Sequence, residues 1–154
     1  MSVSLTTDFS DIQRLQARIG RLSNPQLRDL ADQLGGAVES QTRRRISAEQ
    51  QAPDGTPWAA WSESYAKSRH GNQSLLQGSS SGLLDSITFE VQGDRVEFGS
   101  NLEYARIHQE GGVAGMSPGP AGIPARPYLG LSSDNLIELQ AIADQWLDRH
   151  LEGA

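Results

Sequence analysis

The chain of 154 residues contains no cysteine. This excludes disulfide bonds, thiolate metal sites and cysteine nucleophiles, and it leaves the redox compartment open. No apolar run approaches the roughly 18 residues that a membrane-spanning helix needs. Residues 1–8 have neither the basic start nor the apolar stretch of a secretory signal. We therefore expect a soluble protein that is not exported and has no membrane partner.

Apolar residues are also scarce, at 36% of the chain against a usual share of about 45%, and only 6% of residues are aromatic. Glycine (16 residues) and proline (7 residues) are well represented. A chain of this length buries roughly 70% of its unfolded surface when it folds. We expect one domain over residues 1–154, with long flexible loops.

The net charge of −6 is divided unevenly along the chain. Residues 1–70 carry nine basic and eight acidic residues, a balance of +1, whereas residues 71–154 carry four and eleven, a balance of −7. Two contact faces of unlike charge, or simply a solvated acidic surface, fit this division. The acidic excess argues against tight DNA binding, which depends on neutralising phosphates.

Apolar residues at helical intervals predict N-terminal helices over residues 10–22 and 24–50. Asn24 and Pro25 are suited to the cap and the first position of the second helix. Each residue of the Gly35–Gly36 pair costs about 1 kcal/mol in a helix relative to alanine. We therefore expect a close helix contact or a bend at this pair.

A third helix is predicted over residues 133–151, capped by Ser133. Its outer row is acidic. Its expected apolar stripe consists of Leu136, Leu139, Ala143, Trp146, Leu147 and Leu151.

The central region, residues 51–131, combines turns with a predicted β-hairpin over about residues 87–99, where polarity alternates on both sides of Gln92-Gly93-Asp94. A turn at residues 52–57 precedes three aromatic residues that we expect to form a packing plug, Trp58, Trp61 and Tyr65. Short helices are expected at residues 62–68 and 102–109, an extended segment at 123–131, and mobile loops at 77–82 and 111–122. The predicted class is α+β, with N-terminal and C-terminal helices packed on a small antiparallel sheet.

Catalytic signals are weak. The three histidines, His70, His108 and His150, are 38 and 42 residues apart, so no two share a helical face as metal ligands do. His108 beside a carboxylate is a conceivable base, but a histidine bonded at a helix end is the commoner case. The glycine loop at 111–122 lacks the strand, helix and lysine of a phosphate site. We expect no cofactor, no metal and no enzymatic activity.

Arg43, Arg44 and Arg45 form the one basic cluster in the sequence. Consecutive helical residues point about 100° apart, so the three cannot all face one phosphate groove. A solvated face at the favourable C-terminal end of a helix dipole is one interpretation. Contact with a partner protein and nucleic-acid binding are the others.

A series of ordered motifs from about residue 27 to residue 150 resembles the virion-morphogenesis, or tail-completion, family of Mu-like bacteriophages, which is related to tail terminator and head-tail joining proteins. The motifs are Arg43-Arg44-Arg45-Ile46, Pro53–Trp58, Trp61-Ser62, Tyr65–His70, Leu75-Leu76, Gly82–Ile87, Val96–Asn101, Tyr104-Ala105, Ile107-His108-Gln109, Gly111-Gly112 and Ile123–Leu129. Glu110 departs from the aromatic residue expected before Gly-Gly, and the segment between Gly112 and Ile123 is shorter and less basic than relatives often have.

The resemblance implies a structural protein that completes the tail or joins it to the head. It implies a homo-oligomeric ring, commonly of six subunits, in the virion neck. Its partners would be the head connector or stopper and the tail tube protein, with assembly in the host cytoplasm and genomic DNA passing through the lumen without specific binding. An acidic lumen would repel that DNA, and the two loops would become ordered against adjacent rings.

A ring built head to tail needs two unlike faces on each subunit. We expect the basic end of the long helix to meet an acidic surface, such as the C-terminal helix of a neighbour. The candidate subunit or partner interface consists of Arg43, Arg44, Arg45, Trp58, Trp61, Tyr104, His108, Arg126 and Tyr128.

Overall fold

The computed structural model describes residues 13, 14, 17, 20–69, 71, 73–78, 82–93, 95–112 and 122–151. Most of the predicted helix 10–22, and the centres of the loops 77–82 and 111–122, lie outside the described residues. The described part of the chain is an α+β arrangement with one two-stranded antiparallel sheet, as predicted.

Helices and strands follow one another in the predicted order. They are α2 (Asn24–Arg44), η1 (Arg45–Glu49), α3 (Glu63–Lys67), α4 (Gly82–Ser86), β1 (Thr88–Gln92), β2 (Arg95–Gly99), α5 (Ala105–Glu110) and α6 (Ser133–Leu151). The long helix predicted to reach Gln50 is α2 continued by η1, which is a turn of π-helix.

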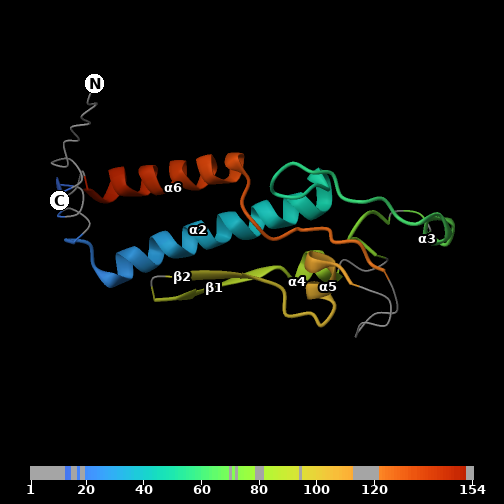
Figure 1. Ribbon diagram of the computed structural model, residues 1–154. Helices are drawn as coiled ribbons and strands as arrows, with labels where there is room; N and C mark the ends of the chain where they lie inside the picture. Colours follow the sequence, from blue (N-terminus) through green and yellow to red (C-terminus); the bar gives the residue numbers. More distant parts are fainter. Residues whose placement is uncertain are drawn as a thin grey trace, which may run out of the picture.

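Helix α2 is the central element of the fold. It lies between α6 on one side and the β1–β2 hairpin on the other, and α4 and α5 lie near its C-terminal end on the hairpin side (Figure 1). The hydrophobic core is concentrated at this end of α2. Its buried members are Ile46, Trp58, Leu83, Ile87, Ala105 and Tyr128.

The cap of α2 is Ser23, one residue before the predicted Asn24. Ser23 Oγ accepts a hydrogen bond from Gln26 N, and Gln26 Oε1 accepts one from Ser23 N at 2.8 Å, which makes a capping box. Because Ser23 pairs with Gln26, three residues later, the helix begins after Ser23, and the cap lies one residue before the predicted one. Pro25 is therefore the second residue of the helix and not the first as predicted, although it still lies in the first turn.

The hairpin packs directly on the middle of α2. Its register pairs Phe89 with Phe98 and Val91 with Val96, and these side chains are the inner members of the alternating pattern. A Cβ added to Gly35 would lie 2.2 Å from the Phe89 ring. A close contact exists at Gly35, but the hairpin makes it and not a helix as predicted, and Gly36 has nothing within 4 Å of an added Cβ.

Helix α6 begins one residue after its cap, which is Ser132 and not the predicted Ser133. Ser132 Oγ accepts a hydrogen bond from Asn135 N, and Asn135 Oδ1 accepts one from Ser132 N. The predicted apolar stripe is wrong at its start. Leu136 is 53% exposed and its neighbour Ile137 is 67% exposed, because Asn135 takes the buried position of the first turn.

The inner face of α6 is fixed near its C-terminal end by Trp146, which is fully buried. The Trp146 indole Nε1 donates a hydrogen bond of 2.7 Å to Asp29 Oδ2 on α2. His150, one turn later, stacks on the Trp146 ring with centroids 3.9 Å apart. The indole thus has both an apolar environment and a polar partner.

The segment 123–131 is extended, as predicted, but no strand pairs with it in the described residues. The side-chain amide of Gln109 takes the place of a strand: its Oε1 accepts hydrogen bonds from the backbone N–H groups of Tyr128 and Leu129, and its Nε2 donates to Leu129 O. At Tyr128 and Leu129 the backbone is therefore satisfied by a side chain, whereas Ile123 and Arg126 bond to the backbone of Gly112 and His108.

Candidate functional site

The arginine cluster at the end of α2 is divided between the interior and the surface. Arg45 is 1% exposed, although charged residues are rarely buried without partners. Its Nη1 donates hydrogen bonds to Tyr128 O at 2.9 Å and to Gly130 O at 2.8 Å. Its Nη2 donates to Asn135 Oδ1. Burial lowers the pKa of Arg45, and the carboxylate of Glu49 opposes that shift.

The other two arginines lie at the surface and contact carboxylates of the same subunit. Arg43 forms an ion pair of 3.0 Å with Glu39 and donates a hydrogen bond to Ile87 O. Arg44 contacts Glu49 at 3.2 Å and Glu138 of α6 at 3.4 Å. The basic end of the long helix does meet the C-terminal helix, and it does so within one subunit.

The aromatic plug consists of Trp58 alone. Trp58 is 6% exposed and its Nε1 donates a hydrogen bond to Pro127 O, whereas Tyr65 is 46% exposed and Trp61 is half-buried. Helix α3 buries none of its residues, and Trp61, which precedes it, is not buried either, so the prediction of a three-residue plug was wrong for Trp61 and Tyr65. Tyr128 is also buried, and its hydroxyl donates to Ala105 O. Burial raises the pKa of Tyr128 to about 12.

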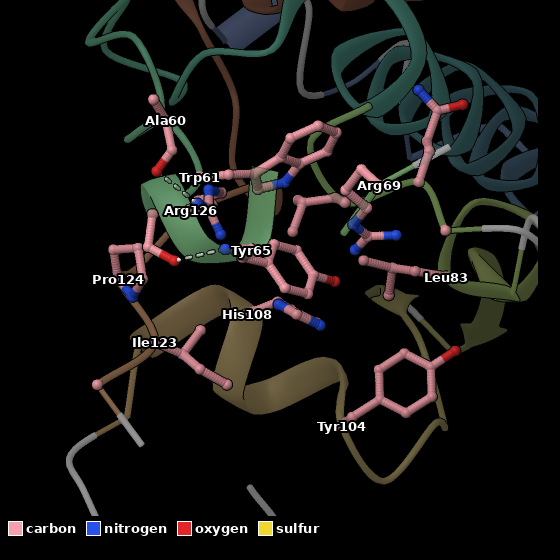
Figure 2. A pocket seen from close by; sticks show the side chains of 15 residues that line it. Ala60, Trp61, Tyr65, Arg69, Leu83, Tyr104, His108, Ile123, Pro124 and Arg126 are labelled. Carbon is pink, nitrogen blue, oxygen red and sulfur yellow. Dashed lines mark hydrogen bonds between the residues drawn. The ribbon is translucent and has the colours of Figure 1, made fainter. Parts of the chain in front are cut away.

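Four of the nine predicted interface residues line one pocket of about 880 Å³, which lies between α3 and α5 (Figure 2). They are Trp61, Tyr104, His108 and Arg126. Of the other five, Arg45, Trp58 and Tyr128 are buried and bonded inside the subunit, and Arg43 and Arg44 lie at the end of α2. The interface assignment of all nine stays a prediction, and the pocket is the surface on which four of them gather.

Arg69 was not predicted as a site residue, yet it lines the pocket beside Trp61 and Tyr65 (Figure 2). Its guanidinium carbon is 4.1 Å from the Tyr65 ring centroid and 5.1 Å from that of Trp61. The two rings meet edge to face at 6.0 Å. Spacings of four residues along α3 and its flanks, from Trp61 to Tyr65 to Arg69, were the available signal.

Arg126 is the second cation of the pocket. Its Nε donates a hydrogen bond of 2.8 Å to Ala59 O and its Nη2 donates one of 3.1 Å to Ala60 O. Its backbone N–H donates to His108 O, which joins the extended segment to α5. The side chain thus holds the wall that carries Trp61, and burial lowers its pKa.

His108 extends from α5 toward the same hollow (Figure 2). Its ring meets the Tyr104 ring edge to face, with centroids 5.8 Å apart, and its buried Nδ1 has no hydrogen-bond partner in the described structure. Burial lowers the pKa of His108, and the nearby charge of Arg126 lowers it further. A neutral imidazole is therefore favoured here.

The chemistry of the pocket follows from the residues that line it. It offers aromatic faces, two guanidinium groups and apolar side chains, and none of the described residues that line it is acidic. The buried Nδ1 of His108 has no hydrogen-bond partner among the described residues. The described part of the chain also holds no group of three or more potential metal ligands.

The comparison with protein families defines the class. A sequence model of the phage virion morphogenesis family matches residues 7–148. The chain therefore belongs to the phage virion morphogenesis family, as the ordered motifs predicted.

Two relatives from Mu-like phages are similar over most of their lengths. A candidate capsid assembly protein, G, of Escherichia phage Mu is 34% identical over 136 residues, which cover 84% of this chain and 85% of that protein. The Mu-like prophage FluMu G protein 1 of Haemophilus influenzae is 27% identical over 151 residues, 96% of each chain. No solved structure matches.

These relationships support a structural role in virion assembly. In the described residues, no helix is long and apolar enough to span a membrane.

Proposed function

We propose that this chain completes the phage tail and joins it to the head, as a ring between the head connector and the tail tube. The membership of nearly the whole chain in the phage virion morphogenesis family supports this proposal most directly. The ring is composed of identical subunits, six in the form that we favour. It contacts the tail tube protein on one side and the connector or stopper on the other, and DNA passes through it without specific binding. The chain acts without catalysis.

The surface of the subunit supports an assembly role. The open pocket between α3 and α5 and the exposed apolar residues of α6 are unlike surfaces on different sides of the fold. Repeated contact between unlike surfaces produces rings when the rotation closes.

The direct test is a phage in which a stop codon interrupts the gene for this chain. We expect its lysates to contain separate DNA-filled heads and tails under the electron microscope. Purified chain added to the lysate should restore joined, infectious particles. Intact tailed virions in the untreated lysate would exclude the proposal.

A second candidate is a role in building the capsid, because the similar protein of Escherichia phage Mu is described as a candidate capsid assembly protein. The same lysates separate the two roles. A capsid role predicts missing or aberrant heads with normal tails, whereas tail completion predicts normal heads.

The alternative of a nucleic-acid-binding accessory protein receives no support from the arginine cluster. Arg45 is buried, and Arg43 and Arg44 already contact carboxylates. A phosphate would have to displace these carboxylates, in a protein whose net charge is −6. A gel shift at physiological salt is the corresponding measurement, and we expect no shift.

A further inference from the structure

The pocket between α3 and α5 is an electropositive hollow on an acidic protein. Arg69 and Arg126 both line it, and within the described part of the chain neither guanidinium contacts a carboxylate. Arg69 donates from Nη1 to the neutral Gln73, and its buried Nε has no partner. Such a guanidinium, fixed in place by two aromatic rings, is prepared to bind an anion.

The pocket is also apolar enough to accept hydrocarbon. Its volume of about 880 Å³ lies within the range of sites that enclose a ligand. Leu83, Ile123 and Pro124 line it together with Trp61 and Tyr104 (Figure 2). A fitting occupant therefore combines a carboxylate with one or two aliphatic side chains.

The first turns of α6 carry that combination on their outer face. Leu136 is 53% exposed and Ile137 is 67% exposed, the two most exposed large apolar residues among those described. Asp134 is exposed too, and it precedes Ile137 by three residues, so the two side chains lie on one face of the helix. We call Asp134, Leu136 and Ile137 the α6 knob.

The knob and the pocket belong to different sides of one subunit. Helix α6 covers one side of α2, whereas α4 and α5 lie on the other (Figure 1). The knob of a subunit therefore cannot enter the pocket of the same subunit in this conformation, but it can enter that of a second copy.

We propose that the pocket between α3 and α5 receives the α6 knob of a second copy, with Asp134 against Arg69 and with Leu136 and Ile137 against the aromatic and aliphatic walls. This contact is head to tail, since a pocket meets a knob and never another pocket. The inference rests on the proposed ring, and it names the two surfaces that build it.

A protein carboxylate fits this pocket better than a nucleic acid does. Aromatic and aliphatic side chains line the pocket beside the two guanidiniums, and the protein as a whole carries a net charge of −6. Nucleic-acid binding depends on several neutralised phosphates, and two guanidiniums supply few. The occupant's charge complements the pocket, and the knob lies in the half of the chain whose balance is −7.

The first test exchanges charges across the contact. Arg69→Glu and Asp134→Arg should each weaken self-association of the full chain at least tenfold in sedimentation velocity, and the double variant should regain most of it. Arg106→Glu and Asp148→Arg are the matched controls, because Arg106 is 80% exposed in an ion pair with Glu110 outside the pocket and Asp148 is exposed near the other end of α6. Both controls should associate as the wild type does.

The second test uses the absence of cysteine from the chain. Ile137→Cys and Tyr104→Cys, made separately and mixed under oxidation, should form disulfide-linked dimers that neither variant forms alone. One chain with both substitutions should give a ladder of linked subunits. Linkage of Ile137→Cys with itself would contradict a head-to-tail contact.

Four results would overturn the inference. These are a wild-type chain that stays monomeric, an Arg69→Glu variant that associates normally, a double variant that regains nothing, and an oligonucleotide that binds the wild type but not Arg69→Glu. None of them bears on whether the phage needs the chain to join heads and tails, which the stop-codon lysate decides separately. A ring that forms without the pocket would leave the proposed function standing and exclude this contact.

Discussion

The guanidinium of Arg45 donates a hydrogen bond to Asn135 Oδ1, and so joins the C-terminal end of α2 to the first turn of α6. The same guanidinium binds the carbonyl groups of Tyr128 and Gly130 in the extended segment that leads into α6. One buried side chain therefore holds three parts of the fold in register. The orientation of α6, and with it the position of the knob, depends on Arg45.

Replacing Arg45 by methionine keeps much of the side-chain volume and removes all of these hydrogen bonds. We expect the free energy of unfolding to fall by about 3 kcal/mol or more, because several buried acceptors lose their donor. Urea denaturation followed by tryptophan fluorescence measures the change. Arg44→Met is the control, and it should cost less than about 1 kcal/mol because its ion pairs are exposed. Equal losses of unfolding free energy in the two variants would mean that the buried hydrogen bonds of Arg45 do not stabilise the fold more than a surface ion pair does.

Gly35 and Gly36 provide a second matched pair. Gly35→Ala should destabilise the protein by roughly 1–3 kcal/mol, because its Cβ would lie 2.2 Å from the Phe89 ring. Gly36→Ala should stabilise it by up to about 1 kcal/mol, because nothing lies within 4 Å and alanine favours helix. Thermal unfolding distinguishes the two. Phe89→Leu should relieve part of the Gly35→Ala defect, and a defect that persists undiminished would locate the clash elsewhere.

Gly111, at the end of α5, adopts φ +79° and lies close to the extended segment. A Cβ there would be 2.9 Å from Ala125 N, whereas Gly93 in the hairpin turn has φ +61° with nothing within 4 Å. Both alanine variants incur a backbone cost of at least about 1 kcal/mol because φ is positive, and Gly111 has in addition a ψ of 172°, in a region that glycine almost alone occupies. Gly111→Ala should cost at least about 1 kcal/mol more than Gly93→Ala, because backbone atoms must also move. Equal unfolding free energies of the two variants would show that the backbone at Ala125 moves away from the new Cβ at no measurable cost.

His108 predicts a specific loss of stability in mild acid. Its pKa in the folded protein is lowered by burial and by Arg126, while the unfolded chain has the ordinary value of about 6.5. Below about pH 6.5 the unfolded state therefore binds the proton more readily, and stability falls as the pH falls. The comparison is denaturation of dilute protein at pH 7.5 and pH 5.5. The wild type should lose more stability between these pH values than His108→Gln does. An equal or larger loss in the variant would contradict a lowered pKa of His108 in the folded protein.

Repeating patterns made much of the fold predictable. Helical spacing placed α2 and α6, alternation placed the hairpin, and Asp54-Gly55 between prolines placed the turn before Trp58. These elements are specified by residues close together in the sequence, so the local pattern is enough to predict them. Where caps moved by one residue, as at Ser23 and Ser132, the serine had a side-chain partner three positions ahead that decided the start.

The buried cations were not predicted, because burying a charge is favourable only when its acceptors converge from distant parts of the chain. Arg45 meets Tyr128 and Gly130 more than eighty residues away, and no local pattern reports such acceptors. The 100° separation of consecutive arginines implied only that the three cannot all face one phosphate groove. The pocket was missed for the same reason, since α3 and α5 each contribute one wall.

The measurement that tests the central claim most directly is the location of this chain in the mature virion. Gold particles bound to a tag on the chain should label the junction between head and tail in electron micrographs of purified, infectious phage. A reconstruction of that junction should then show a ring of copies in which each α6 knob meets the α3–α5 pocket of the next. Label on the capsid shell, or its absence from the virion, would contradict the account.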